Sequence, residues 1–203
     1  MESDLYYTIS KPAEGYYKEK GSKFFSFAFP VKTEEEIKIL RQQLLRQYHD
    51  ARHICFAYRI GPDSNNFKIN DDGEPSGTAG KPIYGQILSY NLTNVVIFVV
   101  RYFGGVLLGT SGLIKAYREA ANNAIINADI ISSTWNDIYS LSFSYYNLND
   151  VMKIIKNENI ITFENKFENN CFLKIKVRKK DSEKIFNIFK KINGLTIEYL
   201  ESE

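Results

Sequence analysis

Two glycine-rich stretches flank one fully apolar segment, and together they constrain the fold more than any other feature. The first stretch covers residues 71–82 and the second covers residues 101–113; eight of the 12 glycines lie between Gly73 and Gly112. Because glycine loses more backbone entropy on folding than other residues, such a cluster indicates left-handed turns or close backbone approach. The apolar segment 95–100 predicts a strand that is buried on both faces.

Apolar residues recur at helical spacing after the second stretch and predict a helix over residues 111–128. The local order is then strand, glycine loop and helix N-terminus. The free N–H groups and the positive dipole end of such a helix converge on one point, where an anion can bind. We expect the two glycine-rich stretches to meet there in one concave site.

The second stretch has nearly the spacing of a phosphate-binding P-loop. In Gly104-x4-Gly109-Thr110-Ser111, however, Thr110 stands where a P-loop has the lysine that reaches the β- and γ-phosphates. This argues against a P-loop nucleotide hydrolase. Anion binding by backbone N–H groups does not need that lysine, and tight loop packing is the alternative explanation of the glycines.

Polar side chains in and near the two stretches are candidates for ligand binding. Asp71, Asp72 and Glu74 could hold a cation, act as acid and base, or cap turns. No metal-loop spacing accompanies them, so we predict no metal site and no cofactor. His53 can reach the site from its own strand, whereas Cys55 is expected to be a buried structural residue. The candidates for anion or ligand binding are His53, Asp71, Asp72, Glu74, Ser76, Thr78, Arg101, Gly104, Gly105, Gly109, Thr110, Ser111 and Gly112.

Further elements are predicted on both sides of these stretches. Thr33 followed by Glu36 is a capping-box signature and opens a helix. Residue patterns also predict strands within 5–20, at 24–29 and at 53–60, a polar loop at 61–70 and a short helix at 82–88.

The residues after a break at 132–134 follow the order βαββαβ, which is the ferredoxin-like pattern. The predicted strands are 138–145, 160–167, 171–178 and 195–200, and the predicted helices are 149–157 and 181–192. We therefore predict an α+β chain with two domains, residues 1–134 and 135–203.

The strand 171–178 carries basic residues on its outer face. Lys174, Lys176 and Arg178 alternate with apolar residues, and Lys179 and Lys180 follow. These five cations are the candidates for RNA phosphate contacts, and a solvated sheet face is the alternative. The paired aromatic residues of an RNA-recognition motif are not expected on that face.

Composition restricts the class of protein. The net charge of +2 is shared evenly between the two predicted domains, so global charge does not indicate a nucleic-acid partner. The acidic start excludes a secretory signal, and the longest apolar run, residues 95–100, is far shorter than a membrane span. The two cysteines fall in different predicted domains, which makes a disulfide framework improbable. We expect a cytoplasmic protein with no membrane partner.

The strings DDGEPSGTAGKP and RYFGGVLLGTSGLIKAY, together with ARHICFAYR upstream, resemble the IMPACT family in its bacterial YigZ-like branch. The resemblance spans about residues 15–128, and the tail resembles the small βαββαβ domain that bacterial members carry. It implies an N-terminal ribosomal-protein-S5-domain-2-like fold, as in domain IV of elongation factor G. It implies a C-terminal domain like domain V of that factor. Eukaryotic members regulate translation under amino-acid starvation, and no established catalytic activity comes with the family.

We therefore expect a non-catalytic binding protein linked to translation, with the ribosome, RNA or a translation factor as partner. A phosphate-containing ligand is expected at the glycine-rich loops. The alternative is a hydrolase of a phosphorylated or nucleotide substrate that uses His53 and the same loops. The sequence favours binding, because it contains no complete catalytic constellation and so predicts no catalytic residue.

Overall fold

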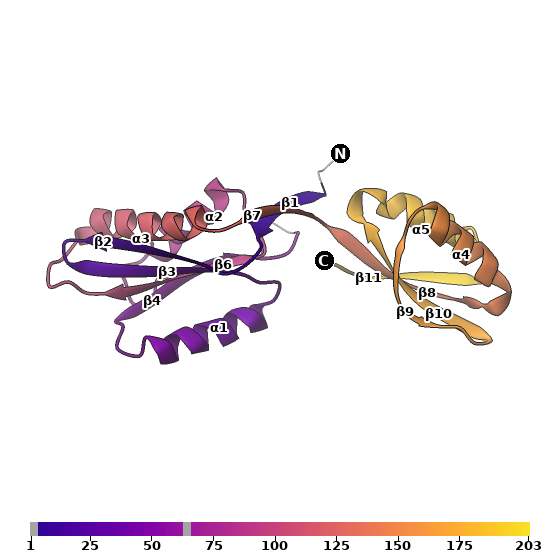
Figure 1. Ribbon diagram of the computed structural model, residues 1–203, viewed down its shortest axis with the longest axis horizontal. Coiled ribbons are helices and arrows are strands. Elements are labelled where there is room, and N and C mark those ends of the chain that lie inside the picture. The colour runs from indigo at the N-terminus through magenta and orange to yellow at the C-terminus, as the bar shows by residue number, and fades with distance from the viewer. Residues whose placement is uncertain (1–3, 63–65) are drawn as a thin grey trace. The chain divides into compact units, whose positions relative to one another are not determined.

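A computed structural model describes residues 4–62 and 66–203 (Figure 1). The chain divides into two compact units: an N-terminal unit of residues 7–132, and a C-terminal unit of residues 133–203 together with residues 4–6. Both units combine helices with antiparallel sheets, so the predicted α+β class is confirmed.

The N-terminal unit is built on a five-stranded antiparallel sheet with the strand order β2-β3-β6-β4-β5. Helix α1 covers one face of this sheet, and α2 and α3 cover the other (Figure 1). The elements are β2 (Ala13–Glu19), β3 (Ser22–Pro30), α1 (Glu34–Gln47), β4 (His53–Arg59), β5 (Phe67–Asn70), α2 (Gly80–Ser89), β6 (Val95–Tyr102) and α3 (Gly109–Ile126).

The centre of this unit is β6, whose side chains are buried on both faces as predicted. Ile97 and Val99 pack into the apolar cluster under α2 and α3. Phe98 and Val100 pack into the cluster under α1. The capping box at the start of α1 is also confirmed, because the Thr33 hydroxyl accepts a hydrogen bond from the Glu36 N–H.

Two short strands were not predicted. The loop predicted at 61–70 contains β5, an edge strand that pairs with β4 and leaves its apolar side chains half-exposed; residues 63–65 of that loop lie outside the described residues. The break predicted at 132–134 coincides with the division between the two units, between residues 132 and 133, but the chain there forms β7 (Ile130–Thr134), which pairs with β1 (Leu5–Ile9). Strands β5 and β7 are short and largely exposed, so they lack the apolar runs that identify core strands.

A close backbone contact positions the loop that follows β6. Lys20 and Gly21 both have positive φ, 44° and 82°, and form the two-residue turn between β2 and β3. A Cβ on Gly104 would lie 1.9 Å from the carbonyl carbon of Gly21, so only glycine fits there. The Gly104 N–H also donates to the Ser22 hydroxyl at 3.2 Å. The turn therefore fixes the start of the second glycine-rich stretch.

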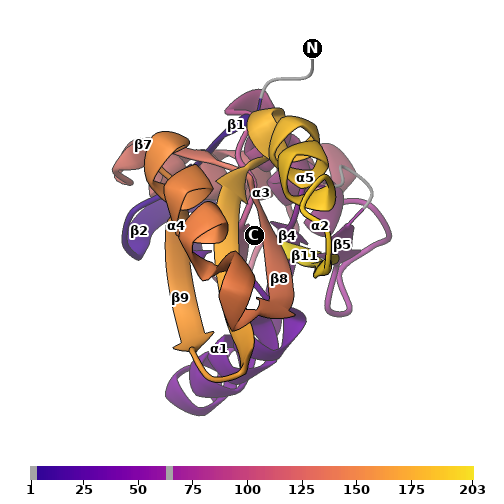
Figure 2. The same cartoon turned by 90° about the vertical axis from the view of Figure 1, so that its right-hand side faces the viewer.

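The C-terminal unit has the ferredoxin-like topology that the βαββαβ order predicts. Its antiparallel sheet has the strand order β11-β8-β10-β9. Both helices pack on one face of that sheet over a shared apolar core (Figures 1 and 2). The elements are β8 (Asn136–Ser144), α4 (Leu148–Asn157), β9 (Ile161–Lys166), β10 (Asn170–Arg178), α5 (Ser182–Lys190) and β11 (Leu195–Ser202).

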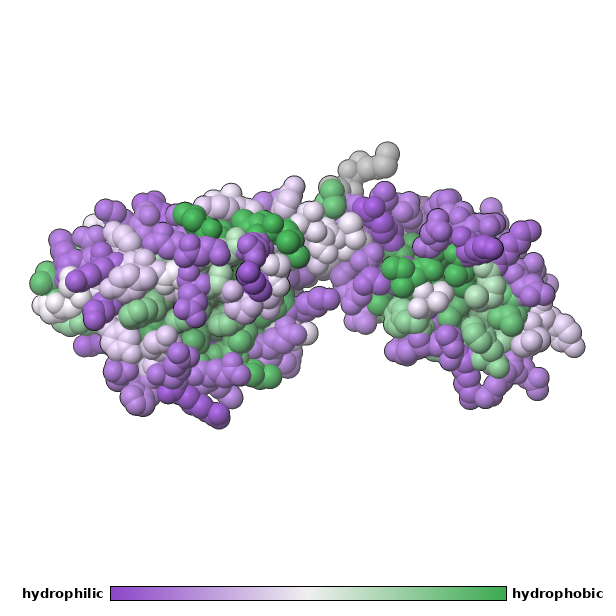
Figure 3. Space-filling model, viewed as in Figure 1, coloured by the Kyte–Doolittle hydropathy of each residue, from purple (hydrophilic) through white to green (hydrophobic). Residues whose placement is uncertain are grey.

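The surface of each unit is mainly hydrophilic in the view of Figure 3, with hydrophobic patches between the charged residues. Across the described parts of the chain, no helix is both long and apolar enough to cross a membrane.

Candidate functional site

The two glycine-rich stretches meet, as predicted, around a cavity of about 340 Å³. The first stretch contributes Glu74 and Pro75 to its wall, and the second contributes residues 107–110. Strand β6 contributes Arg101, and β4 contributes His53. Because Gly109 begins α3, we refer to this site as the α3 cavity.

The first turn of α3 opens into this cavity without a capping side chain. The cap residue, Leu108, has no side-chain acceptor, and the first turn contains no acidic residue. The first four N–H groups of a helix have no partner within the helix. No described side chain accepts a hydrogen bond from these groups in α3. Gly109, at φ 71°, and Thr110 belong to both this turn and the cavity wall, so the turn presents donors and a positive dipole end to the site.

A carboxylate caps the N-terminus of α2. Asp71 Oδ1 accepts hydrogen bonds from the N–H groups of Ala79 at 3.0 Å and Gly80 at 2.8 Å. Its Oδ2 accepts from the Gly77 N–H at 2.9 Å. Asp71 therefore holds the first glycine-rich stretch against the start of α2, and its two oxygens are engaged in that role.

A buried ion pair forms part of the cavity wall. Arg101 Nη1 donates to Glu74 Oε1 at 2.5 Å, and the two side chains are 8% and 4% exposed. The Tyr117 hydroxyl donates to the same oxygen at 2.8 Å. Burial raises the pKa of the Tyr117 phenol, so the hydroxyl keeps the proton that it donates.

One nitrogen of the Arg101 guanidinium, Nε, is buried without a hydrogen-bond partner among the described residues. Leaving a buried donor without a partner costs free energy, especially on a charged group. Because Arg101 lines the α3 cavity, this donor favours an anion or a polar ligand group at the site.

Asp72 orients the imidazole of His53. His53 Nδ1 lies 2.7 Å from the Asp72 carbonyl oxygen, which can only accept, so Nδ1 carries a hydrogen. In the neutral ring Nε2 is then a hydrogen-bond acceptor. The Asp72 carboxylate is itself held by the Ile54 N–H at 2.7 Å and by Arg41 Nη2 at 3.1 Å.

The remaining candidate residues of the two stretches lie in turns or at the start of α3. The Thr78 hydroxyl donates to the Pro75 carbonyl oxygen at 2.7 Å and closes a turn. Ser76 is exposed in that turn. Gly104 and Gly105 precede α3, and Ser111 and Gly112 lie in its first turn.

Cys55 is buried, as predicted for a structural cysteine. Its sulfur lies 3.0 Å from the Asp71 carbonyl oxygen and 3.3 Å from the Tyr117 hydroxyl. Burial, followed by the nearby carboxylates of Glu74, Asp72 and Asp71, raises the pKa of its thiol. A thiol in this setting is a poor nucleophile.

Among the polar and aromatic residues that shape the site, sequence reasoning missed three. Arg52 and Phe103 line the α3 cavity, and Tyr117 supplies the hydroxyl bonded to Glu74. Helical spacing identifies Tyr117 only as a core position. Arg52 stands beside His53 in the sequence, and that adjacency is the only signal that could have identified it. Within residues 4–62 and 66–203, no cluster of three or more His, Cys, Asp or Glu side chains could hold a metal ion.

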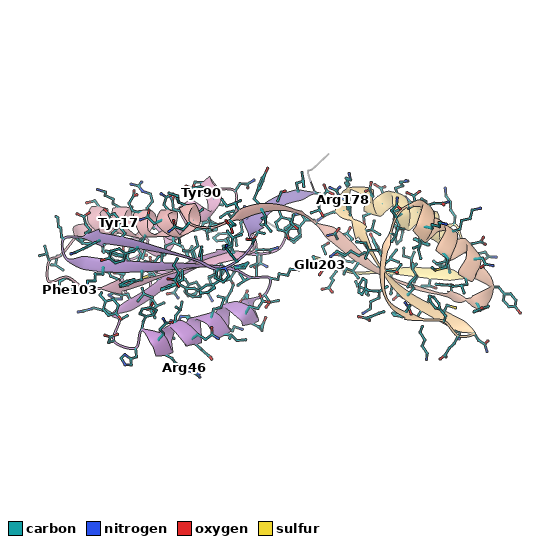
Figure 4. The ribbon with its side chains drawn as sticks, viewed as in Figure 1. Tyr17, Arg46, Tyr90, Phe103, Arg178 and Glu203 are labelled. Atoms are coloured by element: carbon teal, nitrogen blue, oxygen red, sulfur yellow. The ribbon has the colours of Figure 1, made fainter. Side chains whose placement is uncertain are left out.

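Three of the basic residues on β10 are paired with carboxylates. Lys174 Nζ lies 2.6 Å from Glu164, and Lys176 Nζ lies 2.5 Å from Glu203. Arg178 donates two hydrogen bonds to Asp4, at 3.0 and 3.1 Å. Arg178 and Glu203 both belong to the C-terminal unit (Figure 4). Lys179 and Lys180 follow the strand and are exposed. Most of the positive charge on this face is therefore already balanced within the C-terminal unit.

The chain is similar to known proteins along most of its length. The family profile described as the Impact N-terminal domain matches residues 20–125. The chain is 30% identical to "IMPACT family member YvyE" of Bacillus subtilis over 177 residues, which cover 87% of this chain and 82% of that one. It is 35% identical to "IMPACT family member YigZ" of Escherichia coli over 138 residues, which cover 67% and 68% of the two chains.

A solved structure described as that of a hypothetical protein has a similar fold. It aligns with a TM-score of 0.74 and 25% identity, and the alignment covers 98% of this chain and 99% of that one. The family profile, the bacterial relatives and the glycine-rich sequences around the α3 cavity agree, and we conclude that the chain belongs to the IMPACT family.

Proposed function

We propose that this chain is a non-catalytic binding protein of the translation apparatus that acts in the cytoplasm, and that its α3 cavity binds a phosphate group of its partner. The observation that carries the proposal is that the uncapped first turn of α3 and Arg101, whose Nε has no partner among the described residues, line the same cavity. Backbone donors at a helix start and a guanidinium are the groups that bind phosphate in proteins. The IMPACT resemblance supplies the link to translation, where RNA is the abundant source of phosphate.

The arrangement around the cavity supports binding more than catalysis. Glu74 is tied to Arg101 and Tyr117, and Asp71 is tied to the start of α2. Carboxylates held in this way keep the loops in place and have few free lone pairs for proton transfer. Arg52 is exposed, lines the cavity and has no ion-pair partner among the described residues, so it adds a positive charge to the site.

Calorimetric titration with inorganic phosphate at low salt tests the proposal. Wild-type protein should bind, and Arg52→Gln should weaken binding by roughly tenfold, because a charge-assisted hydrogen bond is lost. Gly109→Val should abolish binding, since a β-branched residue cannot easily adopt φ 71°. Arg46→Gln is the matched control: Arg46 is exposed in the last turn of α1 and does not line the cavity (Figure 4). Absence of phosphate binding by the wild-type protein would overturn the proposal.

Sedimentation with ribosomes at low salt tests the translation link separately. Wild-type protein should sediment with ribosomes, and Arg52→Gln should do so less than Arg46→Gln. If the protein binds phosphate but associates with neither ribosomes nor RNA, the phosphate site stands and the proposed link to translation is wrong.

One observation favours a hydrolase as the second candidate. The bond from His53 Nδ1 to the Asp72 carbonyl leaves Nε2 of a neutral ring as a base on the cavity wall. In such a reaction a water molecule would attack the phosphorus, its proton would pass to Nε2, and the bond to the leaving oxygen would break. Hydrolysis of p-nitrophenyl phosphate tests this alternative. It would be established if wild-type protein releases inorganic phosphate and His53→Gln does not, while His53→Gln still binds phosphate.

A further inference from the structure

A second cavity, of about 370 Å³, lies at the same end of the N-terminal sheet. Four aromatic side chains line it, and we call it the aromatic pocket: Phe25, Tyr48, Tyr102 and Phe103. Phe103 also lines the α3 cavity, so the two sites share one side chain. Figure 4 shows Phe103 at the end of this unit, beyond the last residue of β6.

Phe25, Tyr48 and Tyr102 of the aromatic pocket form one ring cluster. The Phe25 centroid lies 6.2 Å from that of Tyr48 and 6.1 Å from that of Tyr102. Tyr16 extends the cluster, with its ring centroid 5.1 Å from that of Phe25. Phe103 lines the same pocket, and its ring centroid lies 5.9 Å from the Arg101 guanidinium carbon. Tyr16 and Phe103 are each 45% exposed, so both rings are accessible to a ligand. A cluster of exposed rings is the structural basis of base stacking in proteins that bind single strands.

Unpaired lysines lie beside these rings. Strand register places Lys23 directly opposite Lys18 on β2 and opposite Tyr102 on β6, and paired residues share a sheet face. Lys20 occupies the turn between β2 and β3. The described residues include no ion-pair partner for any of these three lysines. Like charges directly opposite each other destabilise a sheet, and an anion bound between them removes that repulsion.

The acidic residue of the pocket is already engaged. The Tyr102 hydroxyl donates to Asp50 Oδ1 at 2.7 Å, and this bond is the main reason that the pKa of the carboxyl is lowered. The charged carboxylate repels phosphate from the pocket but not an uncharged base. The aromatic rings of the pocket therefore suit the base of a nucleotide. The neighbouring lysines and the α3 cavity suit its phosphates.

We propose that the aromatic pocket takes one base of a single-stranded RNA, whose backbone phosphates contact Lys18, Lys20 and Lys23 and enter the α3 cavity. This inference rests on the proposed phosphate site. Phe103 stands at the boundary between the base and the neighbouring phosphate. The RNA surface of the protein is then the end of the N-terminal sheet, and the paired cations on β10 lie outside it.

The test uses a short single-stranded RNA with 2-aminopurine at its centre, because the fluorescence of this base falls when it stacks. Binding to wild-type protein should quench it. Phe103→Ala should weaken binding by about five- to a hundredfold and abolish the quenching, and Phe103→Tyr should preserve both. Lys23→Gln should flatten the slope of log K against log[salt] by about 0.7, because one phosphate contact is lost.

Matched controls come from the C-terminal unit. Phe167→Ala removes a ring that is 43% exposed, close to the exposure of Phe103, and should leave binding and quenching unchanged. Lys176→Gln should leave the salt slope unchanged, because Glu203 already pairs with that lysine. Phe103→Ala should still bind inorganic phosphate, since every polar group of the α3 cavity remains.

The inference fails if RNA binds without quenching, if Phe103→Ala binds RNA as wild type does, or if only Lys176→Gln changes the slope. It also fails if inorganic phosphate binds and RNA does not, a result that leaves the phosphate site standing. Absence of phosphate binding by wild type would instead overturn the proposed function itself.

Discussion

Glu74 and Arg101 form a buried ion pair that joins the first glycine-rich stretch to the end of β6. Oε1 and Nη1 lie 2.5 Å apart, and each side chain is less than a tenth exposed. Tyr117 donates to the same Glu74 oxygen from α3. Three segments that are distant in the sequence are therefore connected through one carboxylate, and this connection shapes the wall of the α3 cavity.

Removal of the Glu74 carboxylate should strongly destabilise the N-terminal unit. Glu74→Ala leaves Arg101 buried without a counter-charge, which costs about 3–5 kcal/mol of unfolding free energy. Asp129→Ala is the control, because its pair with Lys11 is mostly exposed and should contribute much less to stability than the buried pair. Urea unfolding followed by tyrosine fluorescence measures both. Equal effects of the two changes would contradict the role assigned to the buried pair.

Two glycine substitutions should have opposite effects on stability. Gly104→Ala places a Cβ 1.9 Å from the Gly21 backbone, so the loop must shift, and a loss of at least about 2 kcal/mol is expected. Gly85 lies inside α2 with no heavy atom within 4 Å of the added Cβ. Gly85→Ala should therefore stabilise by about 0.5–1 kcal/mol. Thermal unfolding distinguishes the signs, and a stable Gly104→Ala variant would refute the close contact.

The Cys55 thiol should react slowly with alkylating reagents. Burial and the neighbouring carboxylates raise its pKa, which reduces the thiolate that attacks the reagent. At pH 8 we expect alkylation of the folded protein to be at least about a hundredfold slower than alkylation of the unfolded protein. Peptide mass mapping separates Cys55 from Cys171. Reaction of Cys55 at the unfolded rate would show that the residue is accessible as a nucleophile.

The bond between Tyr102 and Asp50 should stabilise the fold in a pH-dependent way. The bond lowers the pKa of Asp50 below 3.8, so the folded state favours the charged carboxylate. Its contribution is complete above pH 3.8 and is lost as the pH falls through the lowered pKa. Thermal midpoints of wild type and Tyr102→Phe should differ at pH 6 and converge in acid. A difference that stays constant down to acid pH would exclude Asp50 as its source.

At alkaline pH the titrating group is Tyr102, and its pKa is shifted in the opposite direction to that of Asp50. The same hydrogen bond raises the pKa of Tyr102 to about 12. The protonated phenol is therefore favoured in the folded state, and its contribution is lost only as the pH rises toward that value.

Sequence patterns predicted the parts of the fold that local chemistry determines. The apolar run 95–100, the Thr33 and Glu36 capping box and the βαββαβ order of the C-terminal unit are of this kind. The short strand β5 was missed because its four residues pair at an exposed edge. An edge strand of this length has no distinctive apolar pattern.

The site was predicted in outline but not in its interactions. The glycines identified both loops, yet the roles of their carboxylates depend on partners elsewhere in the chain. Asp71 caps α2, and Glu74 meets Arg101 and Tyr117. The partners of the β10 cations are likewise distant: Arg178 reaches Asp4 across the whole sequence. A single sequence provides no signal for such distant pairs.

Amide chemical shifts measured during titration with inorganic phosphate test phosphate binding in the α3 cavity most directly. The structure predicts saturable shifts that concentrate at the N–H groups of residues 109–112 and at the Nε–H of Arg101. Arg52→Gln should raise the phosphate concentration needed for half-saturation without moving the shifts to other residues. Shifts that do not saturate, or that spread over the surface lysines while the first turn of α3 stays unchanged, would contradict the phosphate site.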